Sequence, residues 1–345
     1  MRILLVKMSS MGDVFHTFPA LTDAQQAIPG LVVDWIVEES FAEIPAWHPV
    51  VDRVLPINLR QWRKQPFAKH TRQAAKVFFE QVNQQDYDLV IDAQGLLKSA
   101  WVTQKIATPK DQKVGLDWAS AREKLASVFY GQKISVATDQ HAITRLRELF
   151  AKALNYPMPS TPICYGLNHQ AWLPLAQVNH QRYIVCLHGT TWATKYWPED
   201  YWQALISKLN QQGYQVILPW GNAEEQARSQ RLAAGLTEQQ AWCPTEPLKL
   251  NDMARLLKHA TAVVSVDTGL SHVAAALDVP LVVLYRVTDP KRVGALGQKV
   301  THLCSPLAPN YIKKFQPGQE QASLEGLGVE DVICAITDFV EVKRH

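Results

Sequence analysis

Short apolar runs rich in valine, isoleucine and leucine recur along this chain, with helical patterns between them. Such runs predict strands over residues 2–7, 32–37, 89–92 and 113–115, and again over residues 183–187, 215–218, 262–266 and 281–285. Strands that alternate with helices form parallel sheets, because a helix carries the chain back to the starting edge. Since 345 residues exceed what one such domain needs, we predict an α/β fold with two Rossmann-like, doubly wound domains facing across a cleft.

A stretch punctuated by four prolines, from Pro157 to Pro174, separates the two halves and has weak periodicity. Proline-rich segments without periodicity are typical of connections between domains. We therefore expect a first domain over residues 1–160, a linker over 161–180 and a second domain over 181–345. The last helical pattern, over residues 330–340, can pack back on the first domain.

Composition indicates a cytoplasmic protein that can rest on a membrane. The five cysteines are scattered without a CxxC pair, and no run reaches the roughly 20 apolar residues of a membrane-spanning helix. The net charge is only +3, but residues 53–76 hold seven Lys and Arg residues and no Asp or Glu. This basic block is either an ordinary solvated face or a patch for nucleic acid, anionic lipid headgroups or a phosphorylated acceptor.

Ligands of open parallel sheets bind at the carboxyl ends of the strands, so the loops there are the candidate sites. After the first strand, Gly12-Asp13 opens a helix. Asp13 either caps that helix or serves as a general base at the cleft. His16, one turn further on, either orients an acceptor or packs in the core.

Two loops of the second half carry hydroxyl, ammonium and carboxylate groups. Thr190, Thr191 and Lys195 suit a diphosphate, since hydroxyls can donate to its oxygens and the ammonium offsets its charge. The alternative is a plain polar loop. Glu225 either completes a capping box with Asn222 or accepts hydrogen bonds from a ribose diol.

The segment from Asp267 through Thr268 and Gly269 to His272 follows a buried strand and opens a helix, which is typical of a phosphate site. A diphosphate would repel Asp267 unless that carboxylate pairs with Lys195 or accepts hydroxyls from a sugar. A sugar diphosphate satisfies both conditions. Residues 86–88 spell the metal-binding pattern Asp-Tyr-Asp but precede their strand, so metal dependence is not indicated.

Several motifs in order and spacing resemble the heptosyltransferases of glycosyltransferase family 9, in particular those of type I. They are Ser9-Ser10-Met11-Gly12-Asp13-Val14, Ile91-Asp92-Ala93-Gln94-Gly95-Leu96, Trp118 with Ala121-Arg122-Glu123, Leu218-Pro219-Trp220-Gly221 and Val264-Ser265-Val266-Asp267-Thr268-Gly269-Leu270-Ser271-His272. The resemblance spans nearly the whole chain. It implies a GT-B fold that transfers heptose, with inversion, from ADP-L-glycero-β-D-manno-heptose to the 3-deoxy-manno-octulosonic acid (Kdo) of Kdo2-lipid A.

The same resemblance implies roles for residues that match the motifs. Asp13 would be the general base and Lys195 would hold the donor beside the heptose. The other donor-binding residues would be Thr190, Thr191, Glu225, Leu248, Asp267, Thr268, Gly269 and His272, and the acceptor-binding residues Arg60, Arg63, Lys64 and Arg122. No cofactor, metal or nucleic acid is implied, and the enzyme would work peripherally on the cytoplasmic face of the bacterial inner membrane, in lipopolysaccharide core synthesis.

Three positions depart from the family pattern. Leu248 stands where Met is expected, Arg286-Val287 replaces Gly-Pro after the strand over 281–285, and Trp192-Ala193-Thr194 is less polar than expected. Three other functions stay open: a sister heptosyltransferase with a heptose acceptor, an epimerase of nucleotide sugars, and a non-catalytic binder of nucleotide sugars or nucleic acid.

Overall fold

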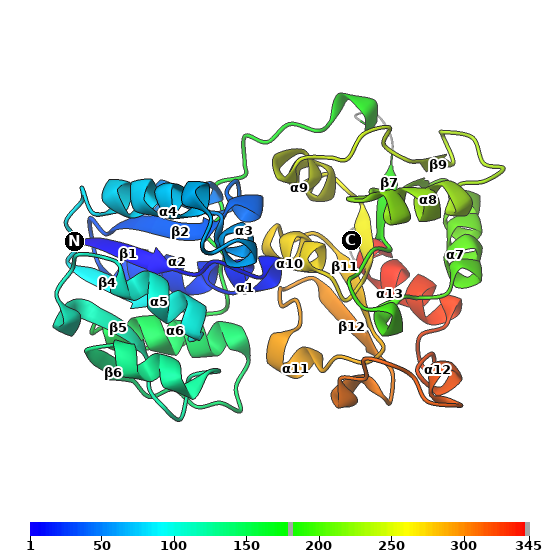
Figure 1. The fold of residues 1–345 in the computed structure, drawn as a ribbon. Helices are drawn as coiled ribbons and strands as arrows, with labels where there is room; N and C mark the ends of the chain where they lie inside the picture. Colours follow the sequence, from blue (N-terminus) through cyan, green and yellow to red (C-terminus); the bar gives the residue numbers. More distant parts are fainter. Residues whose placement is uncertain (179–181, 342–345) are drawn as a thin grey trace. The chain divides into compact units, whose positions relative to one another are not determined.

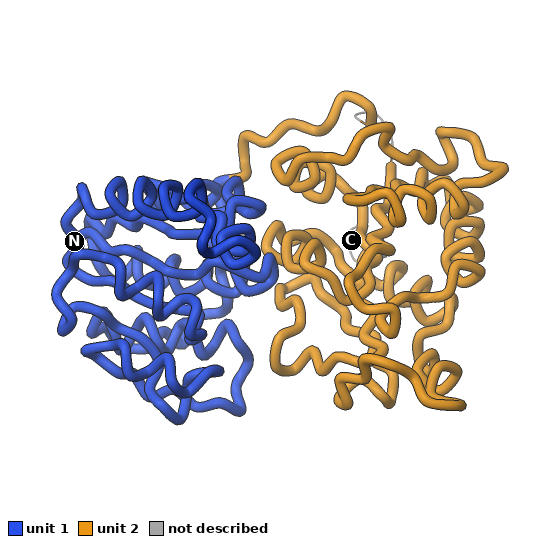
Figure 2. The backbone as a smooth tube through the Cα atoms, in the orientation of Figure 1, with its two compact units in different colours: residues 1–168 blue, residues 169–345 orange. Residues whose placement is uncertain are grey.

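A computed structural model describes residues 1–178 and 182–341 of the chain. These residues form two compact units, Met1–Asn168 and His169–His345, coloured separately in Figure 2. The division falls inside the segment 161–180 that the prolines mark, and residues 179–181 and 342–345 lie outside the described part of the chain. Each unit is described by itself.

Unit 1 is built on a six-stranded sheet of order β3-β2-β1-β4-β5-β6, in which every neighbouring pair is parallel. Its strands are β1 Arg2–Val6, β2 Val32–Glu38, β3 Val51–Ile57, β4 Leu89–Asp92, β5 Lys113–Leu116 and β6 Gln132–Ile134. The four predicted strands of this half are confirmed. The strands β3 and β6 went unrecognised, since β3 contains Arg53 and Pro56 and β6 has only three, mostly exposed residues.

Helices cover both faces of this sheet (Figure 1). They are α1 Met11–Phe15, α2 Phe18–Ala27, α3 Leu59–Lys64, α4 Lys69–Val82, α5 Leu97–Gln104 and α6 Ala142–Ala153. One apolar cluster joins Trp62 of α3, Phe78 of α4 and Val102 of α5 to the sheet, while α2 and α6 pack on each other. The helix predicted to open at Gly12-Asp13 is divided into α1 and α2, because Pro19 has no N–H for an interior position and stands in the first turn of a new helix.

Unit 2 repeats the plan with a parallel sheet of order β12-β11-β10-β7-β8-β9. Its strands are β7 Tyr183–Leu187, β8 Gln215–Ile217, β9 Ala241–Trp242, β10 Ala262–Val266, β11 Leu281–Tyr285 and β12 Val300–Cys304. The predicted strands are again confirmed, and the missed ones, β9 and β12, lie at the two edges. The alternation of strands and helices along the chain therefore builds two doubly wound α/β units.

The helices of unit 2 bury a core in which the Trp197 and Trp202 rings meet edge to face, 4.9 Å apart. They are α7 Glu199–Gln211, α8 Ala223–Leu232, α9 Leu250–Lys258, α10 Gly269–Ala276, α11 Pro290–Val293, α12 Gln319–Ala322 and α13 Val329–Glu341. The last of them, α13, packs on α7 and on the strands β10, β11 and β12 of its own unit. Among the described helices none is long and apolar enough to cross a membrane.

A buried ion pair fastens α6 to α2 in unit 1. Arg147 donates from Nε to Asp23 Oδ2 at 2.5 Å, and both side chains are less than a tenth exposed. Replacing Asp23 by alanine leaves the guanidinium buried without its carboxylate. We expect D23A to lose about 3–5 kcal/mol of unfolding free energy, measured as a lower guanidinium midpoint.

The matched control is the exposed pair of Lys76 and Glu80, one helical turn apart on α4. The E80A variant should change stability by only about 0.5 kcal/mol or less. Equal losses in D23A and E80A would contradict the role of the buried pair.

Candidate active site

The side chain of Gln94 ties the loop after β1 to the loop after β4 in unit 1. Its Oε1 accepts from the Met8 N–H at 2.8 Å, and its Nε2 donates to the Ser9 carbonyl oxygen, also at 2.8 Å. Since β1 and β4 are parallel neighbours, both loops leave the same edge of the sheet. The expected convergence of site residues at this edge is therefore present within unit 1.

Asp13 lies at this edge, in the first turn of α1. Its Oδ2 accepts from the Ser10 N–H at 2.9 Å and from the Ser10 hydroxyl at 3.0 Å, and Oδ1 lies 3.6 Å from Lys7 Nζ. Desolvation alone would raise the pKa of Asp13, but the charges of Lys7 and His16 and the Ser10 hydrogen bonds outweigh it and lower the pKa to about 2. Asp13 thus caps its helix and is also ionised, so the two sequence-based readings are compatible.

The predicted acceptor cations Arg60, Arg63 and Lys64 are exposed on α3, the short helix that follows β3. Buried Glu38 positions this helix, because its Oε1 accepts from the Arg60 N–H at 2.8 Å. The Arg60 guanidinium in turn lies over the Phe41 ring, 5.6 Å from its centroid. These contacts fix the start of α3 at the carboxyl end of the sheet.

The sequence analysis did not single out Lys98, a residue of α5 that contacts the loop before Asp13. Its Nζ donates to Ser9 Oγ at 2.9 Å. Burial lowers the pKa of Lys98, and the nearby Arg60 and Arg63 lower it further, while the carboxylate of Asp13 raises it. Three cations and the candidate base are therefore within electrostatic reach of one another. The signal available in the sequence was its place three residues after Gly95, in the first turn of a helix that follows a strand.

Arg122 lies in a turn that packs against the end of β4. Gly95 adopts a φ of +66°, and a Cβ there would lie 3.7 Å from the Arg122 backbone nitrogen. The Glu123 N–H donates to the Gly95 carbonyl oxygen at 3.1 Å. The turn is thus held at the same edge as Gln94, and the Arg122 side chain is exposed there.

The cations of the basic block over residues 53–76 are divided among β3, α3 and α4. Arg53 lies on β3 and pairs with buried Asp34 at 3.5 Å, whereas Lys76 pairs with Glu80 along α4. The α3 members Arg60, Arg63 and Lys64 are those of the site edge described above. Asp88 lies at the opposite edge and accepts from the Arg2 N–H at 2.7 Å, as its place before β4 predicts.

In unit 2, Lys195 and Asp267 form a close ion pair. Lys195 Nζ lies 2.6 Å from Asp267 Oδ2, and both side chains are about 15% exposed. Thr190 Oγ1 donates to the Asp267 carbonyl oxygen at 2.9 Å, which joins the loops after β7 and β10. The structure therefore contains the ion pair with Lys195 that Asp267 needs in order to lie beside a diphosphate.

The loop after β10 runs directly into α10. Thr268 is the N-cap in an extended conformation, and Gly269 begins the helix. Free N–H groups at such a helix start favour an anion. His272 is buried in the first turn. The Lys195 ammonium and this helix start therefore belong to one polar region of unit 2.

Glu225 lies against the loop after β7. A Cβ on Gly189 would come within 2.6 Å of the Glu225 carboxylate, so a larger residue there would displace this side chain. The Glu225 carboxylate also accepts from the Gly221 N–H at 2.8 Å, and the Glu225 N–H donates to Asn222 Oδ1. Glu225 therefore takes part in capping α8 and also lies beside the candidate donor loop. Thr191 is exposed in the same loop as Gly189. Leu248 is half-buried in the segment that leads to α9.

The departure at Arg286 has a structural explanation. Its guanidinium is buried and donates to Ser323 Oγ and to the carbonyl oxygens of Tyr196 and Glu320. It also lies 4.9 Å from the centroid of the Phe315 ring. Arg286 therefore fastens the segment around residues 315–323 beside the Lys195 loop.

A second cation that sequence reasoning missed, Lys313, reaches the site on this segment. Thr194 Oγ1 donates to the Ile312 carbonyl oxygen at 2.7 Å, which holds the neighbouring backbone. The ammonium of Lys313 lies 5.3 Å from the centroid of the Trp192 ring, and that of Lys195 lies 4.6 Å from it. The indole of Trp192 thus accommodates two cations.

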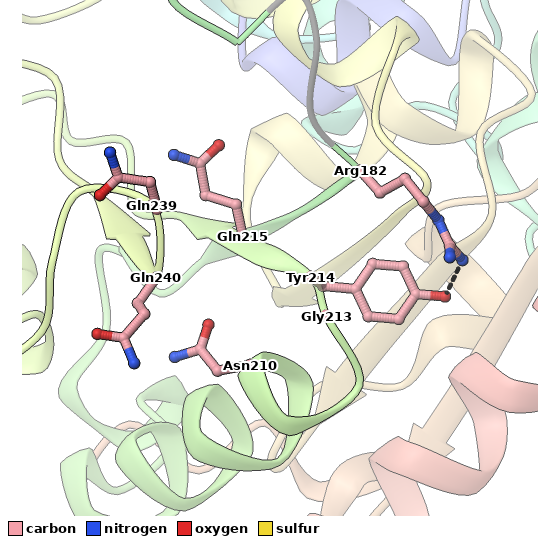
Figure 3. Close-up of a pocket in the computed structure, with 7 residues that line it drawn as sticks. All are labelled: Arg182, Asn210, Gly213, Tyr214, Gln215, Gln239 and Gln240. Atoms are coloured by element: carbon pink, nitrogen blue, oxygen red, sulfur yellow. Dashed lines mark hydrogen bonds between the residues drawn. The ribbon is translucent and has the colours of Figure 1, made fainter.

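A hollow of about 420 Å³ in unit 2 lies elsewhere (Figure 3). It is lined by the residues before β8 and β9 and by the first residue of β8, including Tyr214, Gln215 and Gln240. These residues stand at the amino ends of the strands. The hollow is therefore at the opposite edge of the sheet from Lys195 and Asp267.

The low pKa of Asp13 depends on Lys7, and this generates a pH prediction. The K7M variant removes the ammonium that favours the ionised form of Asp13, while the desolvation that disfavours this form remains. The pKa of Asp13 should therefore rise from about 2 by roughly 1–3 units. Titration of the Asp13 carboxyl carbon by NMR would measure the shift. The exposed Lys133 provides the control K133M, which should leave the pKa unchanged. A titration midpoint in K7M that does not rise would contradict the account.

Comparison with known proteins identifies the family of this chain. The family model described as glycosyltransferase family 9 (heptosyltransferase) matches residues 76–321. Lipopolysaccharide heptosyltransferase 1 of Pseudomonas aeruginosa is 50% identical over 339 residues, 97% of this chain and 93% of that protein. The solved E. coli heptosyltransferase WaaC with ADP-2-deoxy-2-fluoro heptose is 43% identical, with a TM-score of 0.85 over 98% of this chain and 99% of the other.

By contrast, lipopolysaccharide heptosyltransferase 2 of Salmonella typhimurium matches over 107 residues, only 30% of this chain and 31% of that protein, at 39% identity. The likeness to heptosyltransferase 1 covers nearly the whole chain, whereas this alignment covers less than a third of it. The fold is that of the solved heptosyltransferase, a GT-B glycosyltransferase. The chain therefore belongs to glycosyltransferase family 9, the heptosyltransferase family.

Proposed function

We propose that this chain transfers L-glycero-D-manno-heptose from ADP-heptose to the Kdo of Kdo2-lipid A, in the synthesis of the lipopolysaccharide inner core. The observation that carries the proposal is the pair of Lys195 and Asp267 beside the start of α10. A sugar diphosphate matches it, with the ammonium for phosphate and the carboxylate for sugar hydroxyls. The relatives named above support this choice of donor.

The donor would occupy unit 2 along the carboxyl edge of its sheet. Thr190, Thr191 and the N–H groups at the start of α10 would donate to the diphosphate, with Lys195 offsetting its charge. Glu225 would accept from the ribose hydroxyls, and Leu248 would contact the adenine. His272 would reach a phosphate or hydroxyl from the first turn of α10. In this arrangement negative charge that grows on the departing ADP meets donors already in place.

The acceptor would occupy the edge of unit 1. Arg60, Arg63, Lys64 and Arg122 would contact its carboxylates and phosphates, and Lys98 adds a cation next to Asp13. The acceptor oxygen attacks the anomeric carbon as the bond to ADP breaks, and its proton passes to Asp13. With a pKa of about 2, Asp13 is a weak base towards an alcohol, so the proton leaves late, once the new bond has made the oxygen strongly acidic.

Work on a lipid-linked acceptor places the chain at a membrane surface. We therefore propose peripheral action on the cytoplasmic face of the bacterial inner membrane. The exposed cations of α3 support it, because lipid A and its neighbouring headgroups are anionic.

The function is tested by incubating the chain with ADP-heptose and either Kdo2-lipid A or the same acceptor already carrying heptose. We expect ADP release and a product one heptose heavier only with the first. D13N should reduce turnover by about 10²–10⁴-fold while ADP binding stays unchanged. Transfer only to the heptosylated acceptor would favour the sister activity instead, and a D13N rate near that of the parent would remove Asp13 from the base role.

Lys195 is tested by a double-mutant cycle with Asp267. K195A leaves the Asp267 carboxylate facing the diphosphate unopposed, so ADP affinity should fall by roughly 10- to 100-fold. Adding D267N should restore part of the ADP affinity, because the repulsion is removed. Calorimetry with ADP measures both effects.

The control is K208A, which removes a lysine that pairs with Glu330. Its affinity for ADP should equal that of the parent. Additive losses of ADP affinity in the K195A/D267N variant would contradict the pairing argument.

A further inference from the structure

Exposed apolar side chains gather on one part of unit 1. Within the described residues, six of the large apolar side chains that are more than a third exposed fall between residues 97 and 129. They are Leu97, Trp101, Trp118, Leu125, Val128 and Phe129. A clustering of this kind on a surface marks a binding face.

Helix packing explains why these side chains point outward together. The buried residues Ala100, Ala126 and Tyr130 form the contact between α5 and the 3-10 helix η4, Lys124–Phe129. Leu97 and Trp101 are one α-helical turn apart on α5, on the solvent side next to that contact, and both are 42% exposed.

On η4, Leu125 and Val128 are three residues apart, so they share one face of a 3-10 helix, and both are 55% exposed. The buried Ala100 and Ala126 allow α5 and η4 to pack closely, and the larger apolar side chains of both elements face solvent. We call Leu97, Trp101, Leu125, Val128 and Phe129 the α5–η4 patch.

Positive charge borders this patch. Lys105 Nζ lies 5.8 Å from the centroid of the Trp101 ring, and Arg122 and Lys124 are exposed beside Leu125 in the chain. Glu123, between Arg122 and Lys124 in the chain, accepts from the Leu97 N–H at 2.6 Å and keeps its negative charge, so these residues are positive on balance. Aromatic and aliphatic side chains ringed by Lys and Arg are what an anionic bilayer surface binds. The same charges disfavour self-association through this face, since a two-fold dimer would bring like charges together.

The α5–η4 patch is continuous with the acceptor edge. Lys98, which follows Leu97, donates to Ser9 Oγ beside Asp13. We propose that the α5–η4 patch docks on an anionic lipid bilayer, so that a lipid-linked acceptor reaches Asp13 while its acyl chains stay in the membrane. The proposal rests on the proposed function for the acceptor, but bilayer binding itself does not require turnover.

The test is sedimentation with vesicles of phosphatidylglycerol and phosphatidylethanolamine. The L125Q/V128Q variant should lose vesicle affinity by about tenfold or more, because two inserted apolar side chains are replaced by polar ones. The control is L173Q, an equally drastic change at a 71% exposed leucine of unit 2, which should sediment like the parent. Thermal unfolding checks that each variant is folded. K105Q should weaken binding to these vesicles and leave weak binding to phosphatidylcholine vesicles unchanged.

Activity separates this proposal from the proposed function. L125Q/V128Q should keep the parental kcat/KM with an acceptor stripped of its acyl chains and lose rate with the acceptor embedded in vesicles. A parent that transfers heptose to neither acceptor but still binds vesicles would defeat the proposed function alone. The docking proposal is overturned if the parent does not sediment, if L125Q/V128Q sediments equally well, or if the substitutions only dissociate a dimer.

Discussion

The parallel direction of neighbouring strands is the constraint on which both halves of the site depend. In unit 1 it brings the loops after β1 and β4 to one edge, where the Gln94 amide joins them. In unit 2 it does the same for the loops after β7 and β10, joined through Thr190 and the Asp267 carbonyl oxygen. Residues far apart in the chain therefore meet at the carboxyl edge of each sheet.

Each unit places one lysine near one aspartate of the candidate site. The charge of Lys7 helps to lower the pKa of Asp13, and Lys195 lets Asp267 remain beside a region suited to phosphate. In unit 2 a substrate must compete with the internal partner, since Lys195 and Asp267 are already 2.6 Å apart, whereas Lys7 and Asp13 lie 3.6 Å apart. Removing one member leaves a poorly solvated charge, which costs more than the pair itself contributes.

Sequence patterns predicted the two doubly wound units and their central strands because buried parallel strands are continuous apolar runs. They could not predict edge strands such as β6, which has only three residues, or the division of one helix at Pro19. Motif reasoning proposed Asp13, Lys195 and Asp267, because each belongs to the stretch from the end of a strand to the first turn of the next helix of the sheet plan. It missed Lys98 and Lys313, whose proximity comes from helix packing and from a segment fastened by Arg286.

The most direct test of the central claim is a crystal structure with an unreactive ADP-heptose analogue and a Kdo acceptor bound together. The account predicts the diphosphate on Lys195 and the start of α10. It also predicts the attacking hydroxyl within about 3 Å of an Asp13 carboxylate oxygen, on the face of the sugar opposite ADP. A complex in which Asp13 contacts only Lys7 and Ser10, with the hydroxyl facing another base, would contradict it.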